Sequence, residues 1–254
     1  MKIVLLGSGN VATHLASALK TAGEEIVQVF SPSLINAKLL AEKVNAEPVD
    51  DLSKINKLAD LYIISVKDDA IAKVAGSLKT IDGLVVHTSG TTDINVLSSI
   101  LKNAGVFYPL QTFSKSKVVN FAVIPLCLEA TDAKHLEILK VLARKISHKV
   151  YEMGGEKRKV LHLAAVFACN FTNHLYSLAN QILIANDLDF DIIRPLIAET
   201  ADKILIDLPE NVQTGPAVRS DESTIEKHLT MLADLPELQE IYQTLSSSIK
   251  LSHK

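Results

Sequence analysis

The chain begins with Met1-Lys2-Ile3-Val4-Leu5-Leu6-Gly7-Ser8-Gly9-Asn10-Val11-Ala12. Residues 3–6 are all apolar and predict a buried strand, and the pattern after Gly9 predicts a helix. A strand, a G-x-G-x-x-A turn and a helix in this order are typical of a dinucleotide-binding site. Gly7 would form the tight turn, Gly9 would let the backbone approach a pyrophosphate, and Ala12 would keep the helix close to the strand. We therefore expect residues 7–12 to bind a dinucleotide, with its phosphates on the helix N-terminus.

Composition limits the function classes to which the chain can belong. Its 254 residues, 48% hydrophobic and 22% charged, predict one large globular domain or two ordinary ones. The net charge of −3 gives no electrostatic reason to expect binding to nucleic acid or to an anionic membrane. Cys127 and Cys169 lie in apolar surroundings without C-x-x-C spacing, and no His, Cys and Asp cluster has metal-ligand spacing. We expect two buried thiols in a reducing compartment, with neither a disulfide nor a metal site.

Two apolar segments resemble targeting or membrane signals. The apolar core before Gly7 has only four residues, whereas a signal peptide needs roughly 7–15. Residues 161–184 are long and apolar, but hydrocarbon would tolerate their polar side chains poorly. These side chains are His162, Asn170, Asn173, His174, Asn180 and Gln181. The sequence therefore predicts a cytoplasmic protein without a membrane span.

The first 153 residues alternate between short apolar strands and helices. Strands are predicted at 26–30, 47–49, 61–66 and 83–90, and helices at 10–22, 34–44 and 70–78, the last capped by Asp68 or Asp69. This alternation indicates an α/β fold with a Rossmann-like, doubly wound and mainly parallel sheet. Two further strands, 106–110 and 122–128, contain proline, which disfavours a central position in the sheet. A helix at 132–146 and a strand at 149–153 complete the series.

The ends of the predicted strands indicate the cofactor. The second strand ends in Ser31-Pro32-Ser33, without the acid that binds the ribose 2′-hydroxyl of NAD. Ser31 and Ser33 could hydrogen-bond a 2′-phosphate, and Lys38 could add charge, so we favour NADP(H) over NAD(H). Because ligands bind outside the carboxyl ends of parallel strands, we place further contacts near the nicotinamide ring. These are Val66, Lys67, Asp68, Thr88, Ser89 and Gly90, for which capped loops are the alternative interpretation.

After Gly155 the strand signals stop and helical patterns fill the chain, at 157–185, 191–208, 221–233 and 236–249. We place a domain boundary near residue 153, between a dinucleotide-binding domain (1–153) and a helical substrate and dimerisation domain (154–254). In the first of these helices, three- and four-residue steps put polar side chains on one face, which we expect to line a cleft between the domains. They are His162, Asn170, Asn173 and His174, with Val166 among them. The other positions are apolar, so we expect burial on most sides, by the first domain and by a second subunit.

Four segments together resemble one bacterial family, which has a Rossmann-like NADP-binding domain followed by a helical domain of unknown function. They are His87-Thr88-Ser89-Gly90, Phe107-Tyr108-Pro109-Leu110-Gln111-Thr112-Phe113, Asn170-Phe171-Thr172-Asn173-His174 and residues 213–221, QTGPAVRSD. The wider superfamily it resembles includes pyrroline-5-carboxylate reductase, deazaflavin-dependent NADP oxidoreductase, ketopantoate reductase and the β-hydroxyacid dehydrogenases. The resemblance implies an NADP-binding oxidoreductase that forms a homodimer through its helical domain.

Two departures from these relatives keep their substrates from being transferred to this chain. The β-hydroxyacid dehydrogenases carry a catalytic Lys four residues before an Asn on the long helix, where this chain has Val166 before Asn170. Pyrroline-5-carboxylate reductases carry a glycine-rich segment with two threonines in the helical domain, and residues 213–221 differ from it in composition. Neither the substrate nor the acid–base residue of these relatives therefore follows for this chain.

The resulting hypothesis is hydride transfer between NADP(H) and a small carbonyl, imine or hydroxy acid. His162 and His174 are the candidate acids because histidine titrates near neutrality. Asn170 and Asn173 could orient the substrate, Ser89 could contact it, and Arg219 could bind a carboxylate. Asp221 would hold Arg219 or cap the next helix. Two alternatives are a non-catalytic NADP-binding sensor or scaffold, and an oxidoreductase that uses NAD, a flavin or a deazaflavin.

Overall fold

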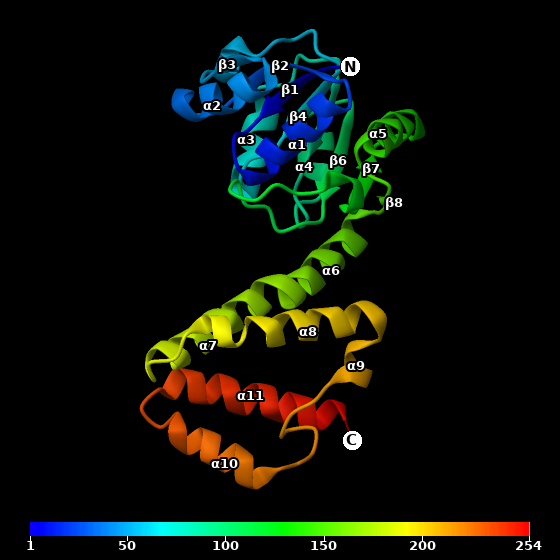
Figure 1. Cartoon of the computed structure of the whole chain (residues 1–254). Helices are drawn as coiled ribbons and strands as arrows, with labels where there is room; N and C mark the ends of the chain where they lie inside the picture. Colours follow the sequence, from blue (N-terminus) through cyan, green and yellow to red (C-terminus); the bar gives the residue numbers. More distant parts are fainter. Residues whose placement is uncertain (254) are drawn as a thin grey trace. The chain divides into compact units, whose positions relative to one another are not determined.

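The structure is a computed structural model that describes residues 1–253, and it divides into two compact units, 1–170 and 171 onward. The first unit contains an eight-stranded sheet (Figure 1). Its strands are β1 (Lys2–Leu6), β2 (Glu25–Phe30), β3 (Glu47–Val49), β4 (Leu61–Ile64), β5 (Leu84–His87), β6 (Ala104–Pro109), β7 (Leu126–Ala130) and β8 (Val150–Glu152). Its helices are α1 (Asn10–Thr21), α2 (Leu34–Val44), α3 (Ile71–Gly76), α4 (Asn95–Ser98), α5 (Ala133–Ile146) and α6 (Gly155–Ala165), with short 3₁₀ turns η1 (Leu52–Lys54), η2 (Asp68–Ala70) and η3 (Phe121–Val123).

The strand order is β3-β2-β1-β4-β5-β6-β7-β8, and every neighbouring pair is parallel except β6 and β7. The chain moves outward from β1 to β3, crosses back to β4 on the other side of β1, and then continues to β8. The order therefore reverses between β1 and β4, which is the position where doubly wound sheets bind ligands. The predicted Rossmann-like α/β class is confirmed.

Strand alternation divides the core of the first unit between the two faces of the sheet. Ile3 and Leu5 of β1 face α1, α2 and α5, whereas Val4 and Leu6 face α3 and α4. The second face continues over β6 and β7, where Leu161 of α6 packs against Val106, Tyr108 and Cys127. The beginning of α6 is thus part of the first compact unit, which extends to residue 170. The domain boundary near residue 153 stays a prediction.

Two predictions about the strands need correction. β6 lies inside the sheet between β5 and β7, although it contains a proline. Pro109 is its last residue and pairs with Leu126, so the missing N–H falls where the ladder ends. The stretch from Ala122 is not strand throughout, because Phe121–Val123 forms η3 and β7 begins only at Leu126.

The long helix predicted from residue 157 is interrupted. α6 ends at Ala165, a π-helical segment, η4, spans Val166–Phe171, and α7 runs from Thr172 to Ile184. A π turn takes up an extra residue, so positions before and after it no longer share a face at steps of three and four. Of the predicted polar face, His162, Val166 and Asn170 do line one cavity, whereas Asn173 and His174, which follow the π-helical segment, are not part of its wall.

The second unit consists of α7 (Thr172–Ile184), the 3₁₀ turn η5 (Phe190–Ile192), α8 (Arg194–Ile206), α9 (Pro209–Val212), α10 (Glu222–Met231) and α11 (Pro236–Ser252). Asp221 caps α10 by accepting a hydrogen bond from the Thr224 backbone N–H at 3.1 Å, which is the second of the two roles considered for it. His228 Nδ1 and Tyr242 Oη, 2.8 Å apart, join α10 to α11.

The expected burial of the long helix is not observed in the single chain. Val160, Leu163, Leu175 and Ile184 are exposed, and Cys169, which we expected to be buried like Cys127, is exposed as well. In the described part of the chain, no helix has both the length and the apolar character needed to cross a membrane.

Candidate functional site

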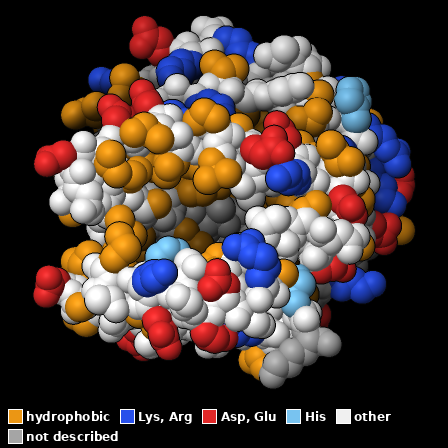
Figure 2. Space-filling view, turned by 60° about the horizontal axis from the view of Figure 1, so that its bottom comes forward, with side chains coloured by type: hydrophobic (Ala, Val, Ile, Leu, Met, Phe, Trp, Pro, Cys, Tyr) orange, Lys and Arg blue, Asp and Glu red, His pale blue; other side chains and the backbone are white. Residues whose placement is uncertain are grey.

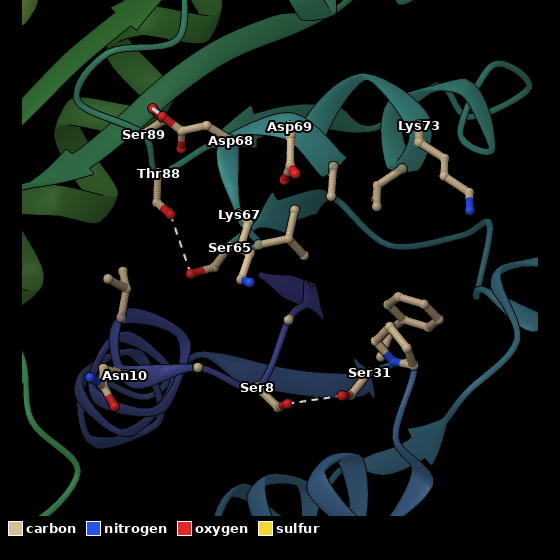
Figure 3. Close-up of a pocket in the computed structure, with 18 of the residues that line it drawn as sticks. Ser8, Asn10, Ser31, Ser65, Lys67, Asp68, Asp69, Lys73, Thr88 and Ser89 are labelled. Atoms are coloured by element: carbon tan, nitrogen blue, oxygen red, sulfur yellow. Dashed lines mark hydrogen bonds between the residues drawn. The ribbon is translucent and has the colours of Figure 1, made fainter.

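A cavity of about 1100 Å³ lies where the carboxyl ends of β1, β4 and β5 meet. Its walls come from the turn after β1, the end of β2, the loops after β4 and β5, and the end of β6 (Figure 3). Most predicted cofactor contacts line it: Gly7, Ser8, Gly9, Asn10, Val11, Ser31, Val66, Lys67, Asp68 and Thr88, together with Ser89 and His162. The cavity therefore brings together residues that are up to 155 positions apart, from Gly7 to His162.

The two glycines of the turn have different roles. Gly7 has a φ of +131°, and a Cβ there would lie 2.0 Å from the Ser65 carbonyl oxygen, so only glycine fits. A Cβ on Gly9 would meet nothing within 4 Å, so the missing side chain leaves open space beside the helix N-terminus. Gly9 is the N-cap of α1, no side chain caps that end, and no acid occupies its first turn. Free helix N–H groups next to open space fit the pyrophosphate of a dinucleotide.

Ala12 supports the turn from within the core rather than lining the cavity. Its side chain is fully buried in the cluster that joins α1 to β1. A larger residue there would push the helix from the strand, as the sequence motif predicts.

The end of β2 provides a pair of hydroxyl groups. Ser8 Oγ donates to Ser31 Oγ at 2.9 Å, and Ser31 is almost fully buried (Figure 3). Ser33 instead caps α2, its Oγ accepting a hydrogen bond from the Asn36 backbone N–H at 3.4 Å, and it is not part of the cavity wall. Lys38 is absent from the wall too, whereas Lys73 of α3 is part of it.

The loop after β4 is tied to the loop after β5. We predicted that Asp68 or Asp69 caps α3, but Asp68 does not. Its Oδ2 instead accepts hydrogen bonds from Ser89 Oγ at 2.8 Å and Thr91 Oγ1 at 2.5 Å. Ser89 Oγ also accepts from the backbone N–H groups of Thr91 and Thr92. The hydroxyl of Ser89 is therefore engaged in shaping the loop that faces the cavity.

A tyrosine and a histidine meet at the far end of the cavity. Tyr108 Oη and His162 Nδ1 form a hydrogen bond of 3.0 Å, and both residues line the wall. Burial raises the pKa of Tyr108 to about 12, so the phenol stays protonated at neutral pH. A Cβ on Gly90 would lie 2.7 Å from His162 Nδ1 and 2.8 Å from Tyr108 Cζ, so glycine is required beside the pair.

Sequence reasoning had not named Tyr108 as a functional residue. The segment that contains it was noted only for its resemblance, and a pair 54 positions apart leaves no periodic signal.

A buried charge fixes the beginning of α6 and, one turn later, His162. The Arg158 side chain is fully buried, pairs with Glu129 and donates to the Thr92 carbonyl oxygen at 2.7 Å. Beside it, burial and the Arg158 charge lower the pKa of His87 to about 4, so His87 is neutral at pH 7. Neither the role of Arg158 nor that of His87 was predicted from the sequence.

The remaining predicted residues lie elsewhere. Asn170 lines a smaller cavity of about 420 Å³ beside the first. Asn173, His174 and Arg219 belong to the second unit, are exposed, and do not line the large cavity. Residues 1–253 contain no group of three or more His, Cys, Asp or Glu side chains arranged to hold a metal ion.

Comparison with known proteins gives two family matches. Residues 2–89 match the model described as NADP oxidoreductase coenzyme F420-dependent. Residues 124–249 match a domain of unknown function, DUF2520. A search of the curated proteins found no match.

Among solved structures, one described as a putative NADP oxidoreductase from Bacteroides fragilis is 47% identical, with a TM-score of 0.94 over 98% of this chain and 97% of that one. A Thermotoga maritima protein is 25% identical, with a TM-score of 0.76 over 99% and 98% of the two chains. A Plasmodium falciparum pyrroline carboxylate reductase with NADP bound shares the fold, at 12% identity and a TM-score of 0.63 over 98% of each chain. The chain therefore belongs to the family in which an NADP oxidoreductase domain of the coenzyme F420-dependent type is followed by the DUF2520 domain.

Proposed function

We propose that the protein is an NADP(H)-dependent oxidoreductase that transfers a hydride between NADP(H) and a small carbonyl, imine or hydroxy-acid substrate. The observation that carries the proposal is one continuous cavity, which runs from the glycine turn of α1 to the Tyr108–His162 pair. Its volume of about 1100 Å³ slightly exceeds the usual range of small-molecule sites, roughly 300–1,000 Å³, and so has room for a ligand as large as a dinucleotide.

Each part of the wall has a place in this proposal. The N–H groups at the start of α1 would bind the pyrophosphate, and the Ser8–Ser31 pair would contact the ribose that carries the 2′-phosphate. Lys67 and Lys73 would supply the positive charge that we had expected from Lys38. Thr88, which donates to Ser65 Oγ at 3.2 Å, and Val66 would lie beside the nicotinamide ring. NADPH, when bound, supplies the hydride that the protein itself cannot provide.

His162 would be the proton donor. In its protonated form His162 would carry a hydrogen on both ring nitrogens, with Nδ1–H donating to the Tyr108 oxygen and Nε2–H free for the substrate; loss of the Nε2 proton then leaves a neutral imidazole that is still hydrogen-bonded to Tyr108. A carbonyl or imine that accepts a hydride on carbon needs one proton on its oxygen or nitrogen, and His162 Nε2 would deliver it. His174, Asn173 and Arg219 remain candidates from the second unit, for contacts with the substrate.

We also propose that the protein acts as a homodimer through its helical part, in the cytoplasm. Large apolar side chains are exposed along α6, α7 and α8, among them Leu163, Leu175 and Leu196. Figure 2 shows hydrophobic side chains gathered in groups on the surface rather than scattered singly. Such patches are typical of subunit contacts. Two free cysteines are consistent with a reducing compartment.

The test is oxidation of NADPH in the presence of carbonyl and imine compounds, by the wild type and by His162→Gln. We expect turnover by the wild type and a loss of at least about tenfold in kcat for the variant, with an unchanged Kd for NADPH. Turnover that is equal in the two proteins would remove His162 from this role. Tight NADPH binding without any turnover would favour the non-catalytic sensor. Binding of a flavin or deazaflavin in place of NADPH would favour an oxidoreductase that uses one of those cofactors.

A further inference from the structure

The cavity of about 420 Å³ adjoins the large cavity and shares part of its wall. Tyr108, Gln111 and His162 line both. The hydrogen-bonded Tyr108–His162 pair therefore stands between the space suited to the dinucleotide and a second, smaller space. A substrate that receives a hydride from one side and a proton from His162 must occupy a space of this kind.

The π-helical segment shapes the second cavity. Ala168, Cys169 and Asn170, three successive residues of η4, line it together with Val166. The π segment thus contributes four of its six residues to the wall, and such segments occur frequently at functional sites.

The chemistry of the lining restricts what the cavity can hold. Most of the wall is apolar, from Leu110, Leu161, Ala165 and Val166 among others. Its polar groups are the amides of Gln111 and Asn170, the Thr112 hydroxyl, the Cys169 thiol and the Tyr108–His162 pair. Among the described residues that line it there is no Lys, Arg, Asp or Glu. A carboxylate placed here would therefore find no Lys or Arg among the lining residues to pair with its charge.

We infer that this cavity is the substrate site, and that it takes an uncharged carbonyl or imine compound with a largely apolar body. The inference rests on the proposed function and narrows it, because it excludes substrates anchored by a carboxylate. The reacting oxygen or nitrogen lies against His162, and the Asn170 amide binds a second polar group of the substrate. The apolar body packs against the alanines of α6 and η4.

Matched pairs of compounds test the substrate class. Cyclohexanone, benzaldehyde and pyrroline are each compared with a carboxylated analogue (oxocyclohexanecarboxylate, formylbenzoate and pyrroline carboxylate) in NADPH oxidation by the full-length protein. The uncharged member of each pair is expected to have at least about tenfold higher kcat/KM. Equal or better turnover of the carboxylated members would overturn the inference and leave the proposed function standing. Absence of NADPH binding would instead defeat the proposed function.

A binding measurement tests the location without requiring turnover. Benzamide, an unreactive amide of the same size class as the test substrates, is titrated by calorimetry into the protein saturated with NADP. Ala165→Phe fills the cavity and is expected to weaken benzamide binding at least about tenfold with an unchanged Kd for NADP. Val141→Phe, at an exposed position of α5 outside both cavities, is the matched control and should bind as the wild type does.

Two outcomes of this titration would overturn the location. They are no benzamide binding by the wild type, and wild-type binding by Ala165→Phe. If Ala165→Phe does not fold, Ala168→Leu at an exposed position of η4 replaces it, with the same expectation.

Discussion

The two units of the chain differ sharply in how they bury apolar side chains. In the first unit, both faces of the sheet are covered, and strand residues such as Leu5, Ile63 and Val86 are completely buried. In the described part of the second unit, only Ala217, Ile225 and Leu232 are buried among the hydrophobic residues. The first unit thus has a hydrophobic core of its own. The second unit leaves many apolar side chains exposed, which is typical of a surface that packs against another protein surface. The cavity proposed to bind the dinucleotide is lined by residues of the first unit alone.

The largest effect on stability is expected from substitution in the glycine turn of the first unit. Gly7→Ala should unfold or severely destabilise the protein, by roughly 3 kcal/mol or more, since it adds both strain at positive φ and a backbone clash with Ser65. Gly9→Ala should retain the stability of the wild type, because its Cβ meets no protein atom. It should nevertheless lose dinucleotide binding. Thermal unfolding and calorimetry of both variants measure this; equal stability of the two would contradict the roles assigned to the glycines.

A buried histidine makes the first unit sensitive to acid. The pKa of His87 is about 4 in the folded state, against an ordinary value of 6.5, so the unfolded chain binds the proton more readily between these pH values. The free energy of unfolding should therefore decrease as the pH falls through this window, by about 2 kcal/mol from this group at pH 5. Urea titrations between pH 7 and pH 5 should give a smaller decrease for His87→Gln than for the wild type. An identical slope in both proteins would remove His87 as the cause.

The exposed apolar side chains of the second unit are expected to pack against a partner subunit in the proposed homodimer. Leu196→Glu, at an exposed position on α8, should weaken the homodimer by on the order of 2 kcal/mol and make the Tm more dependent on protein concentration. Leu58→Glu is the control: it changes an exposed leucine of the first unit and should leave the association unchanged. Analytical ultracentrifugation distinguishes the two. A wild-type protein that stays monomeric at high concentration would contradict the proposed dimer.

The last prediction concerns the rate of the reaction and leaves folding and association unchanged. Tyr108→Phe removes the hydroxyl that orients His162 and should lower kcat by about 10- to 100-fold, with little change in the Kd for NADPH. Stopped-flow measurement of NADPH oxidation separates the two quantities. Wild-type kcat in this variant would mean that the pair has a structural role only.

The sequence predicted those features of the fold that are determined by residues within one short segment. Residues 2–12 contain the strand, turn and helix of the dinucleotide site within one short segment, and the alternation that follows requires a doubly wound sheet. Prediction failed where the cause is distant or irregular. Pro109 is compatible with an inner strand only because the ladder ends there, and the π turn at Val166–Phe171 breaks the period on which the polar face was predicted.

The site shows the same division between local and distant causes. Gly7, Gly9 and Ser31 could be assigned from their own segments. The Tyr108–His162 pair forms only when β6 and α6 come together in the fold. Gly90 is required there because a Cβ would collide with both rings, and this requirement is visible only in the structure. Asp68 was predicted to be a helix N-cap because acidic side chains are common at that position. In the structure its carboxylate instead accepts hydrogen bonds from the hydroxyls of Ser89 and Thr91 in the loop after β5.

The most direct test of the account is titration of the full-length protein with NADPH, NADP, NADH and NAD at matched concentrations, followed by thermal unfolding. A ligand that binds the native state raises the Tm by mass action. We expect binding to require the space beside Gly9, and we expect NADPH and NADP to raise the Tm more than NADH and NAD do. No increase with any of the four would contradict the dinucleotide site on which the proposed function depends.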